Sequence, residues 1–120
     1  MTSYRVDKVE QLIKEQISNI FLHKLSDLHL GFITVTNVKV SADLKIAKIY
    51  LSVLEKEKRN FVLDKLTYNV GQIRTELAHR IRIKFVPELK FFIDDTLDYV
   101  EKIEELLNEI HKQNDRQSNK

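Results

Sequence analysis

The chain has 120 residues, of which 42% are hydrophobic and 32% are charged, and it contains no cysteine. This length supports one small domain with a single core, and the lack of cysteine excludes disulfides and thiolate metal sites. The first residues carry charge in every helical turn and no segment approaches the roughly 20 apolar residues that span a bilayer. The sequence therefore predicts a soluble cytoplasmic protein.

The net charge of +2 hides an uneven distribution along the chain. Residues 37–93 carry twelve Lys or Arg against six Asp or Glu, whereas residues 94–110 carry one Lys against seven Asp or Glu. A basic centre beside an acidic end is typical of a nucleic-acid binder whose acidic helix faces away from the phosphates. The alternative is that both charged regions are solvated faces without a partner.

Apolar residues recur at helical spacing from about Val6 to Leu25 and predict a first helix. Two β-rich runs follow, Phe32–Val40 and Leu44–Val53, joined by a short turn. The alternation of the first run changes phase near Thr36 and Asn37, which predicts a β-bulge there.

Helical spacing resumes from Lys58 to Ile83, with Gly71 in its middle. A straight helix of that length would measure about 39 Å, too long for one small domain. We therefore expect a kink at Gly71 that folds the segment into two helices. Pro87 then ends the helix and precedes a third strand, Glu88–Asp94.

Asp95 or Thr96 is the expected N-cap of a last helix, which begins the acidic region. Its apolar stripe is expected to face the core and consists of Leu97, Val100, Ile103, Leu107 and Ile110. We expect a single domain over residues 1–112 and a disordered polar tail over residues 113–120.

Gly71 has two possible uses. It can allow a packing kink, or it can let a phosphate approach a backbone that no side chain shields. Arg74, Ala78 and Arg82 follow at intervals of four and predict a basic strip on one flank of the second helix, which Arg80 and Lys84 extend. Arginine suits phosphate oxygens, although a merely solvated basic face fits the strip equally well.

Several strings resemble the bacterial ribosome-binding factor A family over about residues 5–110. They are Arg5-Val6, "ITVTNVKVSADLKIAKIYLSV", "GQIRTELAHRIRIKFVPELKFFIDDT" and the closing "IEELL". The resemblance implies an α+β fold, a type II KH-like domain of order α-β-β-α-kink-α-β with a C-terminal helix on a three-stranded sheet. It also implies that the interhelical kink falls on Asn69, Val70 and Gly71.

Two positions depart from the pattern of that family. Asn69 replaces the usual alanine, and its side chain can bond to backbone groups and cap the kink differently. Leu28-His29 stands where the family commonly has Pro-Arg, so that His29 would be a weaker cation near neutral pH.

The resemblance implies a non-enzymatic assembly factor. Such a factor binds the small (30S) ribosomal subunit and assists late maturation and processing of 16S rRNA, including at low temperature. We expect a monomer with no small-molecule substrate, cofactor or membrane partner. The residues expected to bind RNA are the kink, the basic strip and nearby cations: Asn69, Val70, Gly71, Arg74, Arg80, Arg82, Lys84, Lys45, Lys48, Arg5 and Lys8.

Catalytic and metal sites are not predicted. The four histidines have no metal-ligand spacing, and the acids near Asp94 suit helix capping better than magnesium binding. Among the aromatic residues, Tyr50 is the best candidate for base stacking, since it shares the polar face of its strand with Lys48 and Ser52. The other aromatic residues are expected mostly in the core.

A protein-interaction module is the alternative function. In that interpretation the acidic face of the last helix binds a basic partner through Glu101, Glu104, Glu105 and Glu109. The basic strip and the family resemblance both favour RNA.

Overall fold

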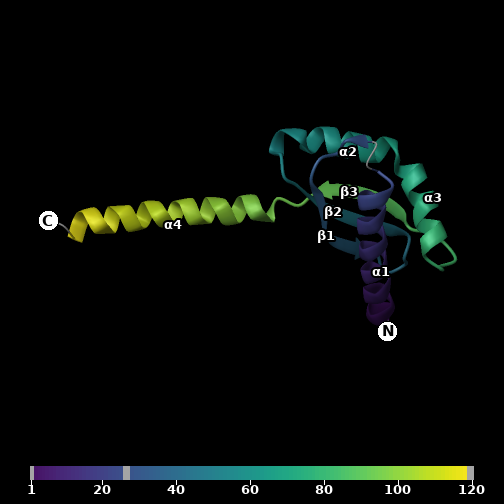
Figure 1. Ribbon diagram of the computed structural model, residues 1–120. Helices are drawn as coiled ribbons and strands as arrows, with labels where there is room; N and C mark the ends of the chain where they lie inside the picture. The colour runs from purple at the N-terminus through teal and green to yellow at the C-terminus, as the bar shows by residue number, and fades with distance from the viewer. Residues whose placement is uncertain (1, 26–27, 119–120) are drawn as a thin grey trace.

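The structure is a computed structural model that describes residues 2–25 and 28–118 (Figure 1). In chain order the elements are α1 Thr2–His23, β1 Ile33–Val40, β2 Ile46–Val53, the short 3-10 helix η2 Lys56–Lys58, α2 Arg59–Tyr68, α3 Val70–Arg80, β3 Glu88–Ile93 and α4 Thr96–Ser118. The predicted α+β class and the predicted order of elements are confirmed.

The three strands form one sheet in the order β1-β2-β3. β1 and β2 are antiparallel, while β2 and β3 are parallel because α2 and α3 connect them. The register of β1 shifts between Val35 and Asn37, which confirms the predicted bulge. At the β1–β2 turn, the carboxylate of Asp43 accepts hydrogen bonds from the Ser41 hydroxyl at 2.6 Å and the Lys45 N–H at 3.1 Å.

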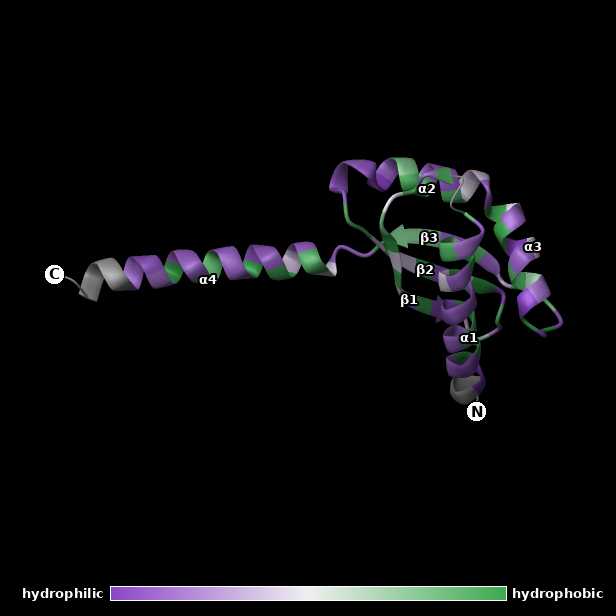
Figure 2. Ribbon diagram, in the orientation of Figure 1, coloured by the Kyte–Doolittle hydropathy of each residue, from purple (hydrophilic) through white to green (hydrophobic). Residues whose placement is uncertain are grey.

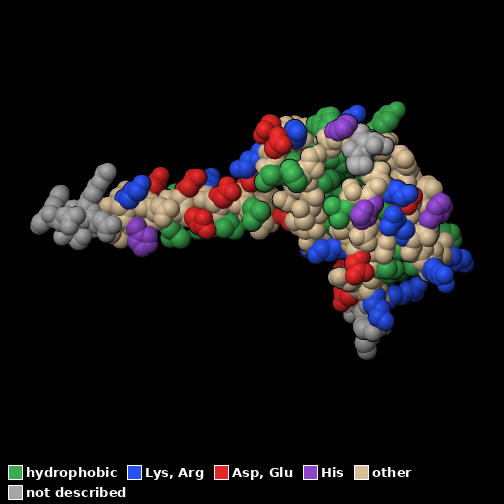
Figure 3. All heavy atoms as spheres, viewed as in Figure 1, with side chains coloured by type: hydrophobic (Ala, Val, Ile, Leu, Met, Phe, Trp, Pro, Cys, Tyr) green, Lys and Arg blue, Asp and Glu red, His purple; other side chains and the backbone are tan. Residues whose placement is uncertain are grey.

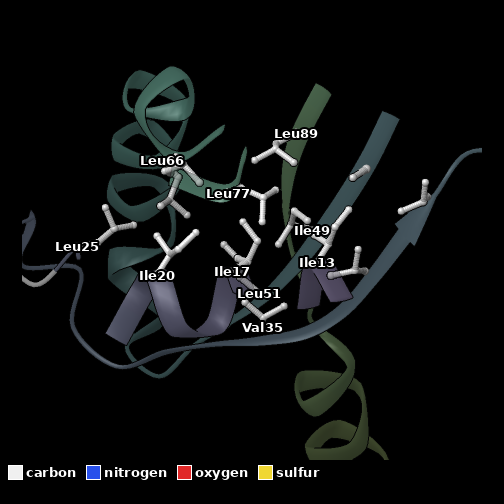
Figure 4. Packing of buried hydrophobic residues seen from close by; sticks show 14 of the residues in the cluster. Ile13, Ile17, Ile20, Leu25, Val35, Ile49, Leu51, Leu66, Leu77 and Leu89 are labelled. Atoms are coloured by element: carbon white, nitrogen blue, oxygen red, sulfur yellow. The ribbon is translucent and has the colours of Figure 1, made fainter. Parts of the chain in front are cut away.

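The core lies between one face of the sheet and a layer of three helices. α1 packs on β1 and on α3, and α2 packs on β3. Figure 4 shows Ile13, Ile17 and Ile20 of α1 pointing toward Ile49 and Leu51 of β2. These five side chains are fully buried, and Leu66 of α2 and Leu77 of α3 close the same cluster.

The opposite face of the sheet carries no helix in the described part of the chain. In the central strand β2, the buried residues Ala47, Ile49 and Leu51 alternate with Lys48, Tyr50 and Ser52, which keep contact with solvent. The hydropathy pattern follows this division, since hydrophobic residues of α1, α2 and α3 turn toward the sheet (Figure 2).

The break between α2 and α3 lies at Asn69, which is within the kink of Asn69, Val70 and Gly71 that the resemblance implies, but two positions before Gly71, where helical spacing alone placed it. Asn69 leaves the helical conformation, with φ −97° and ψ 13°, whereas Gly71 is inside α3. Both the backbone N–H and the side-chain amide of Asn69 donate to the Lys65 carbonyl, at 3.0 and 2.8 Å. Asparagine thus ends α2 by capping its last turn.

α4 projects away from the domain as a single long helix (Figure 1). The expected core stripe on this helix was wrong: Leu97, Val100, Ile103, Leu107 and Ile110 are 44% to 63% exposed. The radius of gyration is 19.1 Å, compared with roughly 14 Å for a compact domain of this length. Helical periodicity reveals that a helix has an apolar face, but it does not identify the surface that covers this face.

The first turn of α4 is nevertheless fixed to the domain. Asp95, one of the two expected N-cap residues, directly precedes α4, and its carbonyl accepts the Tyr99 N–H at 3.3 Å. The carboxylate that accepts the Thr96 N–H, at 3.0 Å, belongs to the residue before it, Asp94. Arg59 of α2 contacts Asp98 at 2.8 Å, and Lys56 lies 3.4 Å from the same carboxylate. The hydrogen bond from Arg59 lowers the pKa of Asp98, so that this pair stays charged at neutral pH.

The helix continues through Ser118, so residues 113–118 of the expected disordered tail are helical. Residues 119 and 120 lie outside the described part of the chain. The division into a domain over residues 1–112 and a separate tail stays a prediction.

Leu66 and Leu107 provide a matched test of this arrangement, because both are helical leucines but only Leu66 is fully buried. We expect Leu66→Ala to lower the free energy of unfolding by about 2–5 kcal/mol, since it opens a cavity in the core. Leu107→Ala should change it by less than about 0.5 kcal/mol. Urea unfolding measures both values, and similar losses would show that α4 packs on the domain.

Candidate nucleic-acid interface

A groove of about 510 Å³ lies where α1, the β1–β2 turn and the segment between α3 and β3 meet. Four cationic side chains line it: Arg5 of α1, Lys45 beside the turn, Arg74 of α3 and Lys84 of the segment after α3. We call this surface the basic groove. Four residues that sequence analysis selected on separate elements therefore come together in space.

Arg74 holds one wall of the basic groove in place. Its Nη2 donates to the Val86 carbonyl at 2.7 Å and its Nε donates to the Pro87 carbonyl at 3.2 Å. These bonds tie the segment before β3 to α3 and use two of the five guanidinium donors. Arg74 therefore positions this wall and also contributes positive charge to the groove.

Phe85 adds an aromatic ring to the basic groove. Its side chain is 75% exposed, and Lys84 Nζ lies 5.6 Å from the centre of the ring. An exposed ring beside a cation is an arrangement on which a nucleic-acid base stacks. Sequence analysis missed Phe85, since aromatic residues near apolar ones were assigned to the core. The signal that could have found it is its position between the end of a helix and Pro87, outside any regular alternation.

A second depression of about 350 Å³ adjoins the basic groove and includes Gly71, Arg74, Ala78 and Phe85. Gly71 is exposed, and a Cβ added there would meet no atom within 4 Å. Packing therefore does not require glycine at this position. The exposed backbone extends the basic groove toward the helix break.

Two carboxylates, Asp43 and Glu88, also line the basic groove, so that cations outnumber them four to two. The hydrogen bonds from Ser41 and the Lys45 N–H lower the pKa of Asp43 and keep it ionised. Because these donors occupy one of its oxygens, Asp43 stabilises the turn that carries Lys45. The excess of positive charge still favours an anionic ligand.

The remaining expected RNA-binding residues lie outside the basic groove. Arg80 forms an ion pair with Glu76 at 3.2 Å. α3 ends at Arg80, so the expected helical row from Arg74 through Ala78 to Arg82 was wrong. Arg82 is exposed beyond the helix end, Lys8 is exposed on α1, and Asn69 and Val70 are half-buried at the break. Lys48 lies on the uncovered face of the sheet.

The space-filling view shows the same division of charge (Figure 3). Lys and Arg side chains gather at the lower right of the domain, while Asp and Glu side chains follow α4. Among the described residues, no group of three or more His, Cys, Asp or Glu side chains is placed to hold a metal ion. None of the helices in the described part of the chain has the length and apolarity needed to cross a membrane.

Comparison with known proteins gives a consistent result. The family model described as ribosome-binding factor A matches residues 5–107. The ribosome-binding factor A of Thermodesulfovibrio yellowstonii is 44% identical over 108 residues, covering 90% of this chain and 92% of that protein. The protein of the same name from Macrococcus caseolyticus is 40% identical over 111 residues, covering 92% of this chain and 97% of that protein.

Solved structures share the fold. The crystal structure of ribosome-binding factor A from Thermus thermophilus superposes with a TM-score of 0.65 at 23% identity, covering 73% of this chain and 94% of that chain. A homology model of the Thermus thermophilus protein, fitted into the cryo-EM map of a 30S complex, gives a TM-score of 0.59 at 21% identity. The match covers 69% of this chain and 88% of that chain.

Gly71 and Gly31 test whether the break needs glycine. Gly71 has open space around it, so Gly71→Ala should raise the free energy of unfolding by about 0.4–1 kcal/mol, by restricting the unfolded chain. Gly31→Ala is the matched control, because Gly31 has φ +76°, a conformation that is unfavourable for alanine. This change should lower the free energy of unfolding by about 1–2 kcal/mol. Thermal unfolding measures both, and a destabilised Gly71→Ala would contradict the assignment of the break to Asn69.

Proposed function

The chain belongs to the ribosome-binding factor A family, and we propose that it binds the small (30S) ribosomal subunit. Two findings support this proposal. A Thermus thermophilus relative of the same fold has been fitted into the map of a 30S complex. The observation that carries the proposal for this chain is the convergence of Arg5, Lys45, Arg74 and Lys84 in one groove.

We propose that the basic groove contacts the ribosomal RNA. Arg5, Lys45 and Lys84 would neutralise phosphates, while Arg74 keeps the wall with Lys84 and Phe85 in position. Such contacts position an RNA without reading its sequence, and they make the affinity depend strongly on salt. The exposed ring of Phe85 would add stacking on an unpaired base.

The finer role that we propose is assistance in late maturation and processing of 16S rRNA, including at low temperature. The protein would act without catalysis, as a cytoplasmic monomer. A binding protein shifts a conformational equilibrium by the difference between its affinities for the two states. A rigid groove that accepts one arrangement of the RNA would therefore favour that arrangement during assembly.

Lys45 and Lys84 give the sharpest test, because both line the groove and neither forms an ion pair with a described carboxylate. We expect Lys45→Gln with Lys84→Gln to lower the slope of log K against log salt by about 1.4 to 1.8, since each lost phosphate contact contributes about 0.7 to 0.9. Co-sedimentation with small subunits, large subunits and 70S particles over a salt series measures this slope.

The control is Lys102→Gln with Lys112→Gln, which removes the same charge from α4. It should leave the slope unchanged. An equal decrease of the slope in both double variants would show that binding depends only on the net charge of the protein. Equal binding to all three particles would contradict the proposed preference for the small subunit. Arg74 is unsuitable here, because its removal would also release the groove wall.

A second candidate function is supported by α4. Its apolar stripe is exposed, and the exposed acids Glu104, Glu105 and Glu109 lie on the same helix. An amphipathic helix with an unpartnered apolar face is suited to a groove on another protein, and its charge favours a basic one. This contact would add to RNA binding and would not compete for the basic groove.

High salt separates the two candidate contacts, because it weakens phosphate contacts much more than apolar burial. If α4 binds a basic protein of the subunit, some co-sedimentation should remain at high salt and should disappear in Ile103→Gln with Leu107→Gln. The low-salt slope should stay unchanged in this variant. Complete loss of wild-type binding at high salt would exclude α4 as an independent contact.

A further inference from the structure

Two rows of side chains cross the uncovered face of the sheet. In the strand register, Lys39 of β1 pairs with Lys48 of β2, which in turn pairs with Lys90 of β3. The adjacent row consists of Asn37, Tyr50 and Phe92 in the same order. One row is therefore cationic and the next carries two aromatic rings.

The lysine row is unfavourable for the sheet itself. All three lysines are exposed, and none of them forms an ion pair with a carboxylate of the described residues. Like charges directly opposite one another on neighbouring strands destabilise a sheet. The repulsion is relieved when an external anion binds across the row.

The aromatic row lies directly beside these cations. The rings of Tyr50 and Phe92 are stacked, with their centroids 5.5 Å apart and their planes inclined by 27°. Phe92 is 39% exposed and Tyr50 is half-buried, although no helix of the described residues covers them. A base can stack on such a pair because every base has an aromatic face, whatever the sequence.

We propose that this uncovered face binds a single-stranded RNA segment, with a base on Tyr50 and Phe92 and phosphates along Lys39, Lys48 and Lys90. Single-stranded RNA fits because its bases are free to leave their own stack, whereas bases in a duplex are not. The inference shares the RNA partner with the proposed function, but the surface is distinct from the basic groove.

Acidic residues mark both ends of this face. Asp94 follows Phe92 along the chain, and its carboxylate accepts a hydrogen bond from Thr36 at 2.6 Å. Glu88 lies two residues before Lys90 and lines the edge of the basic groove. The RNA backbone is therefore expected to cross the strands along the lysine row and not to run parallel to them. The polar neighbours Thr34, Asn37 and Ser52 leave little apolar area for a protein partner.

The first test measures binding of the full chain to a labelled eight-nucleotide oligouridylate by fluorescence anisotropy. We expect Tyr50→Leu and Phe92→Leu each to weaken binding at least about five-fold, which corresponds to the lower limit of stacking on one base. Leucine keeps the apolar contacts of the face, and a thermal melt verifies folding. Tyr99→Leu, an exposed tyrosine on α4, is the matched control and should bind like the wild type. Unchanged affinity in both face variants would overturn the proposal.

The second test does not depend on aromatic packing. The triple variant with Lys39, Lys48 and Lys90 changed to Gln should lower the salt slope for the oligonucleotide by about two, since each single-strand phosphate contributes about 0.7. A larger effect from Lys45→Gln with Lys84→Gln, with no effect from the triple variant, would assign the oligonucleotide to the basic groove and overturn the inference.

Small subunits separate this inference from the proposed function. With a photoreactive side chain at position 48, a crosslink to ribosomal RNA supports the inference. A crosslink only to a ribosomal protein, or to α4 of another copy, overturns it. If the wild-type protein does not bind small subunits at all, the proposed function is contradicted. The oligonucleotide results still decide the role of the uncovered face in that case.

Discussion

The shape of the domain depends on the break between α2 and α3 at Asn69, where φ −97° and ψ 13° leave the helical conformation. α3 can therefore start in a new direction, and both helices bury a stripe against the same sheet. A straight helix through this region could bury only one of those stripes. The turn between the helices also brings Arg74 within reach of the Val86 and Pro87 carbonyls. The wall of the basic groove is thus a consequence of how a helix ends.

A sheet that helices cover on one face offers two distinct surfaces to a partner. The helical layer closes the core and leaves its cations at the periphery, where α1, the β1–β2 turn and the segment before β3 meet in the basic groove. The other side remains free for the rows formed by Lys48 and Tyr50 with their neighbours. Neither surface disturbs the core, because alternation along each strand separates buried from exposed side chains. An RNA partner could therefore be held on both sides of one thin domain.

Local patterns predicted the strands, the helices and the bulge, because burial imposes periods of 2 and 3.6 on the sequence. They failed where the answer depends on distant parts of the chain. The stripe from Leu97 to Ile110 shows that α4 has an apolar face, but not that this face remains exposed. Similarly, Tyr50 was identified as a stacking candidate, while its neighbour Phe92 required the parallel register of β2 and β3. Phe85 was missed because it lies in an irregular segment, where no period applies.

The attachment of α4 gives the molecule a defined reach. Asp94 accepts the Thr96 N–H and Arg59 binds Asp98, so the first turn of the helix is held against the domain. Its 23 residues extend over about 34 Å. Because it is helical and attached at one end, α4 carries its exposed apolar face well beyond the sheet (Figure 1). A partner could contact this face without touching either surface of the sheet.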